Sequence, residues 1–422
     1  MKLDILNNLN SSATLTLNDK INKLKKEGKD IIHFGFGGSP FPIPDFLINS
    51  LKENAYKNEY LPVKGLPELR SNLADYYSTR DQTSLSLDNI VIGPGSKELL
   101  SLIQMSFTDS CVYIPTPTWV SYSSHSKLAN HSIKYINTNF ENNWKLSKDN
   151  LQEIVKNNEV KHKILILNSP SNPTGTIYNK TDLTLIAETL KNENITVILD
   201  EIYEHQSYSN SYLSLAQLLP NKCIITSGLS KSMAAGGWRL GWCVIPFSLN
   251  YILTRVVNLA SETYSTANTP IQYATCSLFN SRYQHEKTTY LQNCNHIMNS
   301  LTRYCTSYLR QYKVNCIYPE ASWYLFLDFS YFTKALQEKN IFTSKELCNS
   351  ILNEINIAIL SGDSFGISDN HYTARLCLVN FDGKIALNQY PENNDITEKW
   401  MYQYCKNSID GIYKLCEWLN HL

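Results

Sequence analysis

The sequence lacks long apolar runs, an excess of charge of one sign and closely paired cysteines, and each absence excludes a class of protein. No run of 18 apolar residues occurs, so we expect no transmembrane helix. The 38 basic residues balance the 38 acidic ones without a basic stripe, which argues against nucleic acid or an anionic membrane as partner. The 11 cysteines include no C-x-x-C pair, so we expect reduced thiols and no metal site. The first residues, MKLDILNNLNSS, do not form a signal peptide, and we expect a cytoplasmic protein.

Apolar residues fall instead into short runs separated by segments of helix length. The runs lie at 90–92, 111–114, 132–136, 164–167, 195–199, 223–226 and 242–245. This alternation predicts an α/β fold with a mainly parallel sheet sandwiched by helices. Ligands of such sheets bind beyond the carboxyl ends of the strands, so we expect the functional site there. The 422 residues also suffice for a second domain.

The most informative stretch is KCIITSGLSKSMAAGGWRLGW at 222–242, which places Lys231 in a turn between two predicted strands. Burial at the mouth of a sheet lowers the pKa of a lysine ammonium, which lets the amine act as a nucleophile. Ser230, free backbone N–H groups and Arg239 in the same turn suit a phosphate. Amine and phosphate site together indicate pyridoxal 5′-phosphate. Taken alone, such a turn is more often an ordinary basic loop.

Other predicted strands also end in polar or aromatic groups. A tight turn leads into a helix N-terminus that favours a phosphate, and an aromatic plane, an asparagine in a rigid turn and an acid–tyrosine pair follow later strands. These residues are Gly95 and Ser96, Trp119, Asn172, and Asp200 with Tyr203. Each could be a turn residue, a helix cap or a core aromatic. Their recurrence at successive strand ends ahead of Lys231 favours one shared site.

The glycines at 35–38 allow the backbone to approach a ligand closely. A dinucleotide-binding loop is the obvious alternative for Gly35-x-Gly37-Gly38. It is disfavoured because neither the remaining glycine of that motif nor a following helix is present.

These motifs, in this order, resemble the class I and II aminotransferases, pyridoxal-phosphate enzymes of fold type I, over nearly the whole chain. The matching segments are NEYLPVKGLPELR (58–70), GSKELL (95–100), IPTPTW (114–119), NSPSNPTG (168–175), LDEIY (199–203), SGLSKSMAAGGWRLGW (227–242) and ARLCLVNFDG (374–383). The resemblance implies a seven-stranded, mainly parallel sheet in a large cofactor-binding domain at 45–290. A smaller α+β domain would occupy 291–422, joined by an N-terminal arm at 1–44. We also expect long helices at 248–282 and 284–312, the second bridging the domains.

The resemblance implies roles at the cofactor. Lys231 would condense with its aldehyde and move a proton between substrate and cofactor, with Asp200 paired to the pyridine nitrogen. Asn172 and Tyr203 would donate to the ring 3-oxygen, and Trp119 would stack on the ring. The groups implied at the phosphate are Gly95, Ser96, Lys97, Ser230 and Arg239. Tyr60 would reach the phosphate of a neighbouring subunit, which implies a homodimer.

The resemblance also assigns the substrate side. Arg375 would pair with the substrate α-carboxylate through its planar fork, although a surface arginine on a strand is the alternative. Gly37, Trp119 and Asn172 would border the substrate, and a side chain at Gly37 would collide with it. Lys97 lies where some family members bind a distal carboxylate, but a solvated lysine at a helix start is also compatible.

Three positions depart from the family pattern. Gly228 replaces a hydroxyl residue, Ser39 stands in place of an acidic residue, and Ser361 replaces a proline. The identity of the substrate therefore stays open. We expect an aminotransferase that moves an amino group between an L-amino acid and a 2-oxo acid by ping-pong half-reactions. The alternative is elimination, cyclisation or oxidation of a specialised amino acid, since the same residues serve those reactions. A cofactor-sensing regulator is disfavoured because the chain is neutral and has no DNA-binding module.

Overall fold

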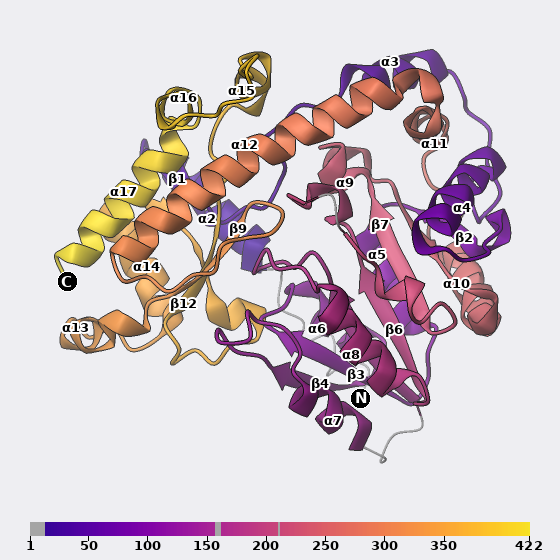
Figure 1. Ribbon diagram of the computed structural model, residues 1–422, viewed down its shortest axis with the longest axis horizontal. Helices are drawn as coiled ribbons and strands as arrows, with labels where there is room; N and C mark the ends of the chain where they lie inside the picture. The colour runs from indigo at the N-terminus through magenta and orange to yellow at the C-terminus, as the bar shows by residue number, and fades with distance from the viewer. Residues whose placement is uncertain (1–12, 157–161, 210–211) are drawn as a thin grey trace.

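The computed structural model describes residues 13–156, 162–209 and 212–422. The larger of its two parts is built around a seven-stranded sheet (Figure 1). The strands run in the order β2-β8-β7-β6-β5-β3-β4. Their bounds are Ile90–Gly93 (β2), Ser110–Thr116 (β3), Ser132–Asn137 (β4), His162–Asn168 (β5), Ile195–Asp200 (β6), Cys223–Gly228 (β7) and Gly241–Val244 (β8). Among the described strands of this sheet, β8 alone runs in the opposite direction to the other six. The predicted seven-stranded, mainly parallel sheet is confirmed.

The two faces of this sheet bury separate apolar cores. In β5, Ile164 and Ile166 face one core, while Leu165 and Leu167 face the other, as the two-residue period of a strand requires. The first core is covered by α5 (Ser96–Met105), α6 (Ser121–Leu128) and α10 (Asn250–Thr263). The second is covered by α3 (Asp45–Asn54), α4 (Pro67–Asp81), α7 (Lys148–Lys156) and α8 (Lys180–Leu190). Burial on both faces explains why the central strands β5 and β6 are largely apolar, whereas the edge strand β4 is mostly exposed.

A smaller α+β unit follows in the chain. Its antiparallel sheet has the order β11-β12-β9, with bounds Leu360–Ser361, Thr373–Cys377 and Tyr324–Asp328. Helices α13 (Thr333–Glu338), α14 (Ser344–Ile355), α15 (Gly383–Asn388), α16 (Glu398–Tyr404) and α17 (Lys406–Asn420) complete it. Near the N-terminus, α2 (Ala13–Lys26) precedes β1 (Ile32–His33), which pairs in parallel with β10 (Ile357–Ala358). This pairing joins the N-terminal arm to the smaller unit. The domain boundaries at 1–44, 45–290 and 291–422 stay a proposal, and residues 1–12 lie outside the described residues.

Two long helices were expected, and one of them forms. Helix α12 (Gln284–Gln311) packs Leu291 against the core of the large sheet and Leu301 against that of the smaller unit, so it bridges the two (Figure 1). The expectation of one helix over 248–282 is wrong. Helix α10 ends at Thr263, Ser265 adopts a φ of 59°, and α11 (Thr269–Thr275) begins after Asn268 caps it. None of the helices described here is long and apolar enough to cross a membrane.

Candidate active site

A cavity of about 480 Å³ opens beyond the carboxyl ends of the parallel strands, a size typical of small-molecule sites. All the predicted site residues line it except Gly95 and Tyr60. Within the part of the chain that the structure describes, its charged lining consists of Lys97, Lys231, Arg239 and Arg375, opposed by Asp200. The cavity therefore favours a ligand that carries negative charge.

Lys231 lies in α9 (Leu229–Ser232), the short helical turn that follows β7. Its Nζ donates to the carbonyl oxygen of Gly37 at 2.6 Å and lies over the ring of Tyr203 at 5.6 Å. Desolvation, aided by the positive charge of Arg375, lowers the pKa of Lys231 to about 8. At neutral pH a larger share of this amine is therefore neutral and nucleophilic than for an ordinary lysine.

Asp200 ends β6 and is buried at the floor of the cavity. Its Oδ2 accepts a hydrogen bond from the Tyr122 hydroxyl at 2.7 Å, and burial raises the pKa of Asp200 to about 6. A cationic ring nitrogen would counter that desolvation and favour the carboxylate. Sequence reasoning missed Tyr122. The available signal is its position three residues after Trp119, at the start of a predicted helix.

Tyr203 and Tyr324 share a hydrogen bond of 2.5 Å between their hydroxyl groups inside the cavity. Tyr324 comes from β9 of the smaller unit and was also missed, because no motif marks it. Tyr324 also explains why residue 37 is a glycine, since a Cβ atom there would lie 2.4 Å from the Tyr324 hydroxyl oxygen. The expected collision with substrate stays a prediction, whereas a collision with Tyr324 follows from the geometry.

Arg375 is on β12 and is only 2% exposed, so the alternative of a surface arginine is wrong. Its Nη1 donates to Asn172 Oδ1 at 3.1 Å and its Nη2 to the Gly35 carbonyl oxygen at 2.7 Å. Its Nε has no hydrogen-bond partner among the described residues. Arg375 lines the cavity, and its Nη1 and Nη2 each carry a second N–H beyond these hydrogen bonds, so the guanidinium suits a carboxylate ligand.

At the other end of the cavity, Arg239 lies against the turn before α5. Its Nη2 donates to the Pro94 carbonyl oxygen at 3.1 Å. Gly95, at a φ of 97°, would place any Cβ atom 2.4 Å from that Nη2, so only glycine fits. The N-terminus of α5, the guanidinium and Ser230 thus line one recess suited to a phosphate. The cavity fits pyridoxal phosphate on this ground and through its buried acid and its amine.

Trp119 and Lys97 lie together on the cavity wall, with the Lys97 Nζ 5.5 Å from the centre of the indole ring. Tyr60 lies outside the cavity and is 91% exposed. A single chain does not bring Tyr60 to its own site, so its contact with a neighbouring subunit stays a prediction.

Known proteins resemble this chain over most of its length. The family described as aminotransferase class I and II matches residues 6–382. Aspartate aminotransferase of Bacillus sp. (strain YM-2) is 30% identical over 85% of this chain and 90% of that protein. A probable aspartate/prephenate aminotransferase of Rickettsia conorii is 32% identical over 86% of this chain and 90% of that protein. In fold, the chain matches Thermus thermophilus aspartate aminotransferase with maleate, with a TM-score of 0.83 at 20% identity over 98% of both chains.

Proposed function

This chain belongs to the class I and II aminotransferase family, and from that premise we propose that it binds pyridoxal 5′-phosphate at Lys231. As an aminotransferase it moves an amino group between an L-amino acid and a 2-oxo acid. Elimination, cyclisation or oxidation is not favoured, because the curated relatives are aminotransferases. The observation that carries the cofactor proposal is one cavity that holds Lys231, Asp200 and Arg375 together.

When bound, the cofactor supplies an aldehyde that exchanges for the amino group and a ring that takes up electrons from the substrate. Lys231 Nζ is the group placed to take up and return the proton of the substrate Cα. The Asp200 carboxylate would pair with a protonated ring nitrogen. Tyr203 and Asn172 would donate to the ring 3-oxygen, and Trp119 would lie against the ring face.

The remaining groups orient the two ends of the bound molecules. Arg239, Ser230 and the turn formed by Gly95 and Ser96 anchor the phosphate, and Arg375 aligns the α-carboxylate. We further propose a homodimer in which Tyr60 reaches the phosphate of the partner copy, supported by its exposure. The proposed location is the cytoplasm.

We propose a dicarboxylic amino acid as one substrate. Relatives are named aspartate and aspartate/prephenate aminotransferases, and Lys97 lies in the cavity beside Trp119. A lysine there would pair with a second carboxylate. The test is to add single amino acids, without oxygen, to the protein loaded with pyridoxal phosphate. Aspartate or glutamate should convert the cofactor absorbance to that of the amine form, and a 2-oxo acid should restore it. No conversion by any amino acid would overturn the proposed function.

Replacing Lys97 with methionine should lower the ratio of kcat/KM for aspartate to that for alanine. A lost ionic hydrogen bond of about 1.5–3 kcal/mol corresponds to a change of roughly 10- to 100-fold. Because Lys97 also borders the phosphate site, its replacement should lower kcat/KM for both amino acids through the cofactor. The ratio of the two values isolates the effect on the second carboxylate. An unchanged ratio would assign Lys97 to the cofactor or to solvent.

Replacing Arg375 with lysine should raise KM for both the amino acid and the 2-oxo acid. A lysine cannot offer the planar fork, and the loss of one charge-assisted hydrogen bond should lower kcat/KM by roughly 10- to 100-fold. Steady-state kinetics with both substrates measure this change. The control is Arg255→Lys, because Arg255 is an exposed arginine that donates to the Ser106 carbonyl oxygen outside the cavity. Equal effects of the two substitutions would remove Arg375 from substrate binding.

A further inference from the structure

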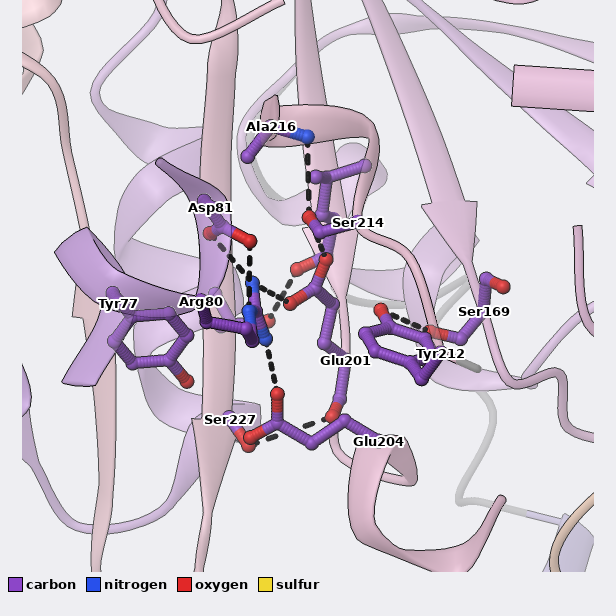
Figure 2. Close-up of polar contacts among 12 residues, drawn as sticks. Tyr77, Arg80, Asp81, Ser169, Glu201, Glu204, Tyr212, Ser214, Ala216 and Ser227 are labelled. Carbon is purple, nitrogen blue, oxygen red and sulfur yellow. Dashed lines mark hydrogen bonds and ion pairs between the residues drawn. The ribbon is translucent and has the colours of Figure 1, made fainter. Parts of the chain in front are cut away.

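Behind the carboxyl ends of the strands, one arginine lies among three buried carboxylates (Figure 2). Arg80, in the last turn of α4, places its Nη2 2.7 Å from Asp81 Oδ2 and 2.8 Å from Glu201 Oε2, and its Nη1 bonds to Glu204 Oε2. The three carboxylate side chains are 2–3% exposed. Burial of such ions is costly and gives little net stability over an apolar core, so a role other than stability fits this cluster.

Two of the carboxylates are next to proposed site residues in the sequence. Glu201 directly follows Asp200, and Glu204 directly follows Tyr203. Arg80 therefore forms ion pairs at both ends of residues 201–204, next to the two residues proposed to contact the cofactor, Asp200 and Tyr203. Inside this segment the Glu204 N–H donates to the Glu201 carbonyl oxygen at 3.0 Å.

The same cluster reaches the neighbouring turns. The Glu201 N–H donates to the Thr226 carbonyl oxygen on β7 at 2.9 Å, and the Ser227 hydroxyl approaches the Glu201 carbonyl oxygen at 3.5 Å. Tyr212, whose ring lies 5.7 Å from the Arg80 guanidinium, donates from its hydroxyl to the Ser169 carbonyl oxygen at 3.0 Å (Figure 2). The cluster thus connects β7, which leads to Lys231, with the turn that holds Asn172.

The charges of the cluster do not balance. Asp81, Glu201 and Glu204 oppose Arg80, and the other titratable groups that face them are Tyr76, Tyr77, Tyr212, Cys223 and His205. Burial lowers the pKa of His205 to about 4, so the imidazole supplies no positive charge at neutral pH. Burial also raises the pKa of Glu201, against the opposing effect of Arg80. Any change in the charge of this cluster should change the electrostatic potential at Asp200, which directly precedes Glu201.

We propose that Arg80 is a positioning residue which, through Glu201 and Glu204, fixes Asp200 and Tyr203 against the cofactor. The inference rests on the proposed function, because it assigns those two residues to the cofactor ring. Arg80 itself does not line the cavity, so it would act through these neighbours.

The test compares Arg80→Lys with Arg70→Lys, a control on the same helix. Arg70 is also buried, but it bonds to the Leu87 and Ile90 carbonyl oxygens and to Asp88, away from the strand ends. For each protein the dissociation constant for pyridoxal phosphate and the pH midpoint of the bound cofactor's absorbance are measured. Melting temperature without cofactor reports folding.

We expect Arg80→Lys to bind the cofactor about tenfold more weakly, to shift the absorbance midpoint, and to lower kcat by roughly 10- to 100-fold. Arg70→Lys should change the melting temperature alone. If Arg80→Lys does not fold, Glu204→Gln replaces it, because that change removes a buried negative charge and keeps the side-chain shape. A folded Arg80→Lys or Glu204→Gln protein with the wild-type midpoint and dissociation constant would overturn the inference. Failure of the wild-type protein to bind the cofactor would instead overturn the proposed function, and this inference with it.

Discussion

Replacing Lys231 with alanine is expected to abolish amino transfer, with kcat at least about 10⁴-fold lower. The variant loses the amine that joins the cofactor and the group that moves the Cα proton. The Lys231 Nζ already lies within the cavity, against the Gly37 carbonyl oxygen, and its pKa of about 8 keeps a usable neutral fraction near neutral pH. Among the described residues, Lys97 is the only other lysine that lines that cavity, and its Nζ lies beside the Trp119 ring rather than at the Gly37 carbonyl oxygen.

The measurement is steady-state turnover with saturating pyridoxal phosphate, so that weak cofactor binding does not limit the rate. A matched control is Lys222→Ala, at the opposite end of β7. Desolvation also lowers the pKa of Lys222, but its Nζ bonds to the Glu193 carbonyl oxygen away from the site. Lys222→Ala should retain near-normal turnover. Near-normal turnover of Lys231→Ala would remove this lysine from the mechanism.

Replacing Asp200 should have the second-largest effect, lowering kcat by roughly 10²- to 10³-fold and weakening cofactor retention. Asp200→Asn removes the charge but keeps an oxygen that can accept the Tyr122 hydrogen bond, whereas Asp200→Ala removes both. If the charge is what matters, the two variants should be similarly impaired. Tyr122→Phe, which removes only the hydrogen-bond donor, should lose much less activity. Turnover and the cofactor retained after dialysis are measured for each, and an active Asp200→Asn enzyme would refute the role of the charge.

The raised pKa of Asp200 predicts that the stability of the protein without cofactor depends on pH. Because burial raises the pKa of Asp200 to about 6, the folded state binds more protons than the unfolded chain between about pH 4 and pH 6. Its contribution to stability is therefore fully present at lower pH and is lost as the pH rises through about 6. We expect Asp200→Asn to melt higher than the wild type at pH 8 when cofactor is absent, and to lose that advantage at acidic pH. Bound cofactor should reduce the difference, because its ring nitrogen pairs with the carboxylate.

Much of the fold and site could be predicted because the signals are local. Each central strand is a continuous apolar run, and the residues proposed at the cofactor follow those runs directly in the sequence, as Asp200 follows β6. Parallel strands then bring these residues to one edge of the sheet. Apolar runs carry no direction, so the antiparallel course of β8 could not be read from them.

The missed features depend on contacts between distant segments. Tyr324 reaches the site from another sheet, and Arg80 meets Glu201 and Glu204 across more than a hundred residues of sequence. Neither residue belongs to a spacing pattern that marks its partners. The break after α10 is set by a positive φ at Ser265, a residue that is compatible with helix in most contexts.

We propose that the Lys231 amine carries the cofactor of this aminotransferase. Reducing the protein loaded with pyridoxal phosphate by borohydride, followed by mass spectrometry of its peptides, tests this directly. We predict a single fixed adduct on Lys231, at one per chain. An adduct on another lysine, or none, would show that Lys231 does not carry the cofactor.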